Sequence, residues 1–185
     1  MEDEKFYIQR YAQASNGAYV KDGKERSLED DFGFCRYKSM TGINARGKQK
    51  GFYVETYTEA NSARVWFSET AKREQITSTL TIYVFGSDPE ATTDKTLPEQ
   101  ILSAENSWNE LCDWLENHFL LWHDDHRQRK ALFYLSEAVE PTSVIKGVPY
   151  LLCQIKLTNV FGKTFPMEDN TIEDWLSNGG KEVGL

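Results

Sequence analysis

The stretch Gln75-Ile-Thr-Ser-Thr-Leu-Thr-Ile-Tyr-Val-Phe85, followed by Gly86, decides the fold class. Apolar residues recur at every second position on one face of this stretch, namely Ile76, Leu80, Ile82 and Val84. The other face is polar or amphipathic, with Thr77, Thr79, Thr81 and Tyr83. Such alternation is typical of an antiparallel strand with one face on the core and the other toward solvent. The sequence therefore predicts an antiparallel β-sheet.

Further strand patterns lie on both sides of this stretch, separated by turn residues or short polar connections. They cover residues 6–8, 52–58, 63–67, 130–135 and 150–157. Because the connections between 52 and 85 have hairpin length, a meander is the simplest topology for that part. We expect about six to eight strands in one sheet or in a sandwich or barrel.

One long helix is expected after the central strands. Thr96-Leu-Pro-Glu99 has the hydroxyl, proline and glutamate of a capping box, which marks a helix start. Apolar residues then recur at steps of three and four, at Ala104, Trp108, Leu111, Leu115, Phe119 and Trp122. A helix over 99–122 would be about 36 Å long.

A second, short helix is predicted over 171–177, before Gly179 and Gly180. The fold class is therefore α+β, an antiparallel sheet with one long helix packed across it. A chain of 185 residues suits a single domain, 1–185.

Charge and composition exclude several classes of protein. A net charge of −8 has the wrong sign for a protein that grips phosphate backbones over its whole surface. No run approaches the roughly 20 apolar residues of a membrane helix, and the N-terminal residues lack the pattern of a signal peptide. We therefore expect no association of the protein with a membrane. Three widely spaced cysteines without a CxxC pair predict a reducing compartment, with neither a disulfide framework nor a zinc cluster.

The positive charge is concentrated in one segment. Residues 1–50 have a net charge of +2, whereas residues 51–185 have −10. An extended basic loop is predicted over about 38–51, because this segment is rich in glycine and lacks acids. The basic residues in and just before it are Arg36, Lys38, Arg46, Lys48 and Lys50.

This basic loop is complementary to acids of the predicted helix. Its solvent side should carry Glu99, Glu105, Glu110, Asp113 and Glu116. We expect the loop of one copy to contact the helix of the next. A contact between unlike patches is heterologous and generates rings or stacked tubes. The alternative is a loop that is merely solvated.

All three histidines fall within nine residues, which raises the alternative of a metal-dependent enzyme or binding module. The candidate ligands are His118, His123, Asp124, Asp125 and His126. His123 and His126 would share a helical face, yet no ligand signature such as HExxH is present. The structural alternative is that these groups cap and solvate the helix end. We therefore predict no cofactor, no metal and no enzymatic activity.

Several segments resemble proteins of tail and neck modules encoded in phages and prophages of Bacteroides-type bacteria. The resemblance covers most of the chain and lies in Phe6-Tyr-Ile-Gln-Arg10, Tyr37-Lys-Ser-Met-Thr-Gly-Ile-Asn-Ala45, Arg64-Val-Trp-Phe67, Leu120-Leu-Trp-His-Asp-Asp-His-Arg-Gln-Arg-Lys-Ala-Leu-Phe-Tyr-Leu135, Glu137-Ala-Val-Glu-Pro-Thr142 and Tyr150-Leu-Leu-Cys-Gln-Ile-Lys-Leu-Thr-Asn-Val-Phe-Gly162. These motifs carry no catalytic residues. The order of elements is also similar to that of tail tube, tail terminator and distal tail ring proteins.

The resemblance implies a structural protein of the virion that is present in the host cytoplasm during assembly. It implies a homo-oligomeric ring with an inner β layer, a long loop at 42–50 that reaches the neighbour, and contacts with other tail or neck proteins. DNA would only pass through the opening of such a ring, which an acidic lining would favour. A monomeric or dimeric host-interaction protein is the third hypothesis.

Overall fold

The computed structural model describes residues 5–57, 62–124 and 126–181. It contains three helices, α1 (Leu28–Asp31), α2 (Leu97–Leu115) and α3 (Thr171–Ser177). The twelve described strands are β1 (Phe6–Gln13), β2 (Tyr19–Lys21), β3 (Arg26–Ser27), β4 (Phe34–Thr41), β5 (Gln49–Tyr57), β6 (Ser62–Arg73), β7 (Ile76–Phe85), β8 (Phe119–Asp124), β9 (Arg129–Ala138), β10 (Thr142–Val144), β11 (Tyr150–Asn159) and β12 (Phe165–Pro166). The predicted antiparallel sheet is confirmed, with more strands than expected.

Ten strands form one antiparallel sheet, whose main path runs β2-β1-β8-β9-β11-β7-β4. The short strands β3, β10 and β12 pair with β1, β11 and β9. The predicted meander over 52–85 is wrong, because β7 pairs with β11 and β4, whereas β5 and β6 pair with each other in a separate ribbon. β11 and β4 pair with the two edges of β7, and α2 covers its apolar face, which agrees with an interior position in the sheet.

Two apolar clusters lie on opposite faces of the sheet. Adjacent residues of one strand separate them: Leu120 belongs to the cluster under α2, and Leu121 packs against the cluster under α3. The α2 cluster includes Leu80, Ile82, Val84, Trp108, Leu111, Leu115, Leu151, Cys153, Ile155 and Leu157. The α3 cluster consists of Tyr11, Leu132, Phe165, Ile172 and Leu176, with further partly buried rings around it.

The predicted start of α2 is confirmed by a complete capping box. The backbone N–H of Glu99 donates to Thr96 Oγ1 at 3.4 Å, and the N–H of Thr96 donates to Glu99 Oε2 at 3.0 Å. These two hydrogen bonds satisfy amide groups that the first helical turn leaves without partners.

The predicted end of this helix is wrong. α2 stops at Leu115, so its 19 residues span about 28 Å. Asn117 follows with φ of 60°, a left-handed conformation that ends the helical path. In β8 burial alternates residue by residue, with Leu120 and Trp122 buried, which is the period of a strand. The spacing of Phe119 and Trp122 therefore continued the helical stripe by coincidence.

Within residues 5–57, 62–124 and 126–181, no helix combines the length and apolar composition needed to cross a bilayer.

The three cysteine thiols are free and buried in the α2 cluster. Burial raises the pKa of Cys35 to about 12 and that of Cys112 to about 11, and it also raises the pKa of Cys153. Because the thiolate is the reactive form, alkylation of the folded protein at pH 8 should be very slow.

We expect all three thiols to react quickly with iodoacetamide once the protein is unfolded in guanidinium chloride. The raised pKa values also mean that stability falls as the pH rises above about 8.5, where the unfolded thiols ionise and the folded ones do not. Mass spectrometry of the alkylated protein measures how many thiols are labelled, and urea unfolding at a series of pH values measures the change in stability. Rapid labelling of the native protein would show that the α2 cluster opens readily.

Candidate assembly surfaces

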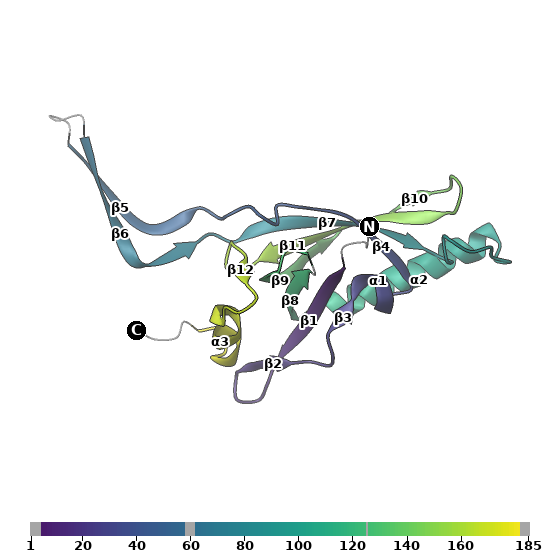
Figure 1. Ribbon diagram of the computed structural model, residues 1–185, viewed down its shortest axis with the longest axis horizontal. Helices are drawn as coiled ribbons and strands as arrows, with labels where there is room; N and C mark the ends of the chain where they lie inside the picture. Colours follow the sequence, from purple (N-terminus) through teal and green to yellow (C-terminus); the bar gives the residue numbers. More distant parts are fainter. Residues whose placement is uncertain (1–4, 58–61, 125, 182–185) are drawn as a thin grey trace.

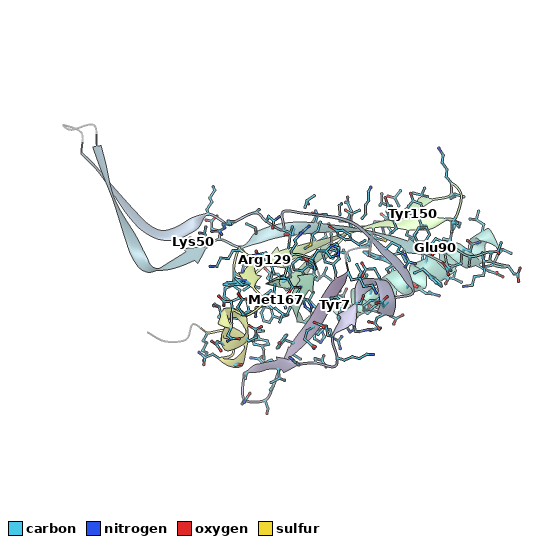
Figure 2. All side chains as sticks on the ribbon, viewed as in Figure 1. Tyr7, Lys50, Glu90, Arg129, Tyr150 and Met167 are labelled. Carbon is cyan, nitrogen blue, oxygen red and sulfur yellow. The ribbon has the colours of Figure 1, made fainter. Side chains whose placement is uncertain are left out.

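The five predicted basic residues fall into two groups on the structure. Arg36 and Lys38 belong to β4, where the Lys38 Nζ lies 5.6 Å from the centre of the Tyr83 ring. Arg46, Lys48 and Lys50 are exposed and lie around the start of β5. Figure 2 shows Lys50 at the base of the β5–β6 ribbon. The structure therefore brings together three of the five.

The predicted loop over 38–51 is shorter than expected. β4 continues to Thr41 and β5 begins at Gln49, so residues 42–48 form the connection. Met40 and Ile43 are 9% and 5% exposed, and burying them holds this segment against the core. The sequence prediction gave these two residues too little weight beside the three glycines.

The β5–β6 ribbon projects away from the body of the molecule (Figure 1). Its base is fastened by backbone hydrogen bonds: the N–H of Gly47 donates to the carbonyl of Gly162, and the N–H of Glu74 donates to the carbonyl of Lys48, both at 2.9 Å. The Arg73 guanidinium also donates to the carbonyl of Gly47, at 3.2 Å. These contacts fix the ribbon where it leaves the sheet.

Two glycines make this close approach possible. A Cβ atom on either Gly47 or Gly162 would overlap the carbonyl oxygen of Glu74. Gly162 also has φ of 65°, which L side chains rarely adopt. The direction of the ribbon therefore depends on Gly47 and Gly162, which periodicity and charge did not identify.

The predicted acidic face of the long helix is confirmed. All five of its acids are exposed, namely Glu99, Glu105, Glu110, Asp113 and Glu116. Glu110 lies 3.9 Å from the Arg26 guanidinium, a long and largely exposed pair that contributes little. α2 extends toward one end of the long axis of the molecule and the ribbon lies at the other (Figure 1). The basic group at the ribbon base and the acidic face are thus well separated within one chain.

Two of the three histidines, His118 and His123, contact separate carboxylates, and His126 is exposed. His118 Nδ1 donates to the carbonyl of Glu116 at 2.6 Å, and its Nε2 lies 2.9 Å from Asp22 Oδ2. His123 Nδ1 lies 3.2 Å from Glu25 Oε1.

The helical face that His123 and His126 were expected to share does not exist, because His123 lies in strand β8. Asp124 is fully buried and accepts from the backbone N–H of Arg127, whereas Asp125 lies outside the described residues. In the part of the chain that the structure describes, no three His, Cys, Asp or Glu side chains gather closely enough to hold a metal ion.

No protein-family model matches the chain, and no curated protein matches it. Among solved structures, the chain is similar to a chain in the structure of the phage p2 baseplate in its activated conformation with Sr, with a TM-score of 0.51 and 10% identity. The match covers 85% of this chain and 44% of that one, so this chain spans less than half of its length. An identity this low shows that the two chains share a fold, and nothing more.

Proposed function

We propose that the chain is a non-enzymatic structural protein of a phage tail or neck, and that identical copies assemble head to tail into a ring. The observation that carries this proposal is the placement of the projecting β5–β6 ribbon at one end and the acidic face of α2 at the other. The fold similarity to a baseplate chain supports a role in the virion.

The ribbon is poorly suited to stand alone. An isolated two-stranded ribbon is at best marginally stable in water. The register pairs Phe52 with Phe67 and Tyr53 with Trp66. Two consecutive register positions of the ribbon are thus aromatic in both strands. Contact with a neighbouring copy would therefore stabilise the ribbon beyond what its own strand pairing provides.

Charge determines the direction of the contact. The exposed cations at the ribbon base, Arg46, Lys48 and Lys50, match the exposed carboxylates of α2 on the next copy. Because the two patches differ, an open chain of subunits keeps one unoccupied basic patch at one end and one unoccupied acidic patch at the other. Closing the ring brings these two patches into contact. Other tail or neck proteins would be its further partners. DNA would only pass through the opening, since the net charge of −8 disfavours binding to it.

Reversing the basic group to glutamate at Arg46, Lys48 and Lys50 should block assembly and leave folding intact. Each substitution replaces attraction to α2 of the neighbour with repulsion. We expect the oligomers of the unmodified protein to become monomers, as measured by light scattering coupled to size-exclusion chromatography at low salt. Circular dichroism and thermal melting should stay close to those of the unmodified protein.

A matched control reverses Lys21, Lys24 and Lys146, which are equally exposed and lie away from the ribbon base. This control has the same net charge and should still assemble. Adding lysine at Glu110, Asp113 and Glu116 to the first variant should restore oligomers. Unchanged oligomers in the first variant would contradict the charge contact, and an unmodified protein that stays monomeric at high concentration would contradict self-assembly.

A further inference from the structure

A pocket of about 550 Å³ opens on the α3 face of the sheet, where β1, β2, β9 and α3 meet. Aromatic rings make up much of its wall, and they brace each other. The Phe119 ring meets the Tyr19 ring edge-on at 4.9 Å between centroids and the Trp175 ring edge-on at 5.4 Å. Tyr11, also in the wall, is 6% exposed. Edge-on packing of this kind holds the rings in place before any ligand arrives.

Apart from His118, the polar part of the lining consists of amide and hydroxyl groups. The amide side chains of Gln13, Gln75 and Asn117 line the pocket and belong to exposed residues. The Tyr134 hydroxyl donates to Gln75 Oε1 at 3.2 Å, which leaves the amide NH₂ of Gln75 to donate elsewhere. His118 completes this side of the pocket.

No lysine, arginine, aspartate or glutamate is among the described residues that line the pocket. A phosphate, a nucleotide or a metal ion would therefore find no opposite charge there. The volume lies within the range of about 300–1,000 Å³ that is common for small-molecule sites. The lining thus favours an uncharged ligand that has both apolar surface and hydroxyl groups.

We propose that this pocket is a binding site for a neutral carbohydrate. The C–H faces of a sugar ring would pack on the aromatic wall, and its hydroxyls would donate to and accept from the amides of Gln13, Gln75 and Asn117. Gln75 Oε1 accepts from Tyr134 and Gln13 Nε2 donates to the Gly17 carbonyl, and a purely apolar ligand would displace water from the remaining amide positions without replacing its hydrogen bonds. The inference depends on the monomer alone and does not require the proposed ring.

Gln75 also connects the pocket to the ribbon. It directly follows Glu74, whose backbone N–H is bonded at the ribbon base. A sugar bound by Gln75 would therefore lie beside the segment from which the ribbon projects.

The test is a glycan array probed with the full-length protein, followed by calorimetric titration of the best neutral oligosaccharide. We expect neutral glycans to bind and sialylated or sulfated glycans to bind no better than their neutral counterparts. Gln75→Ala and Asn117→Gly should each weaken binding about tenfold, since each removes hydrogen bonds to the sugar. Glycine at 117 accepts the left-handed backbone found there, so the fold should persist.

The matched control is Gln154→Ala, which removes an exposed glutamine of β11 outside the pocket and should leave affinity unchanged. Stoichiometric binding of an uncharged apolar probe such as naphthalene, which neutral glycans fail to displace, would overturn the proposal in favour of an apolar ligand. An array with no signal above background would also overturn it, as would an equal loss of binding in Gln154→Ala.

Discussion

Glu173→Ala is expected to lower the free energy of unfolding by about 3 kcal/mol, because it leaves a buried ammonium group without its counter-charge. Lys130 Nζ lies 2.6 Å from Glu173 Oε1, and the Lys130 side chain is 4% exposed. This pair joins α3 to β9 across the edge of the α3 cluster, where Ile172 and Leu176 are buried. Urea unfolding followed by tryptophan fluorescence measures the change.

Lys130→Met should cost less than Glu173→Ala, since the Glu173 side chain is 35% exposed and can be hydrated when its partner is removed. The double variant should be more stable than Glu173→Ala alone, because it contains no unpaired buried charge. Glu137→Ala is the matched control. It breaks an exposed pair with Lys156 of 2.9 Å and should cost about 1 kcal/mol or less.

If Glu173→Ala and Glu137→Ala lowered the free energy of unfolding equally, burial of the Lys130 ammonium group would not be the cause of the loss. Strictly additive effects in the double variant would show that the two groups do not interact. Because Trp175 belongs to α3 and to the pocket wall, Glu173→Ala should also weaken sugar binding, and Lys130→Met should do so less.

The sequence predicted best those elements whose burial pattern is local. Both central strands follow the two-residue period over most of their length: Leu80, Ile82 and Val84 are buried in β7, and Leu151, Cys153, Ile155 and Leu157 are buried in β11. The capping box likewise involves residues only three positions apart. In these cases the residues that determine the structure lie within the element itself.

Features that depend on distant contacts were missed. The end of α2 depends on β8 entering the sheet between β1 and β9, which no window around Leu115 reveals. β5 and β6 were predicted as strands of the main sheet, whereas they form a separate ribbon. A signal was present, because Phe52-Tyr-Val54 and Val65-Trp-Phe67 have consecutive apolar residues where a strand exposed on one face would alternate.

The positions of the candidate site residues were predicted well where they follow from local periodicity and poorly where they depend on contacts between distant elements. The acidic face of α2 follows from helical periodicity and is correct in all five positions. The basic residues are adjacent in sequence, but β4 carries Arg36 and Lys38 away from Arg46, Lys48 and Lys50. The pocket combines residues from β1, β2, β8, β9 and α3, so it could only be found once those elements were placed together.

Replacing residues 51–71 with an Asn-Gly turn is expected to abolish assembly and to leave a folded monomer. Lys50 and Lys72 are register partners, so a two-residue turn can join them without straining the base. The hydrogen bonds of Gly47 and Glu74 at the base would remain. Among the described strands, β5 and β6 pair only with each other, so the ten-stranded sheet loses no partner.

The shortened protein should therefore melt cooperatively near the temperature of the unmodified protein while its mass in solution falls to that of one chain. Inserting Asn-Gly after Gly147, an exposed turn before β11, is the control and should leave assembly unchanged. Oligomers of normal size without the ribbon would show that the subunits associate through another surface. A shortened chain that fails to fold would show that the ribbon stabilises the monomer, although β5 and β6 share no backbone pairing with the described strands of the ten-stranded sheet. Loss of assembly in this variant, together with retained sugar binding, would assign the ribbon to subunit contact and the pocket to a separate role.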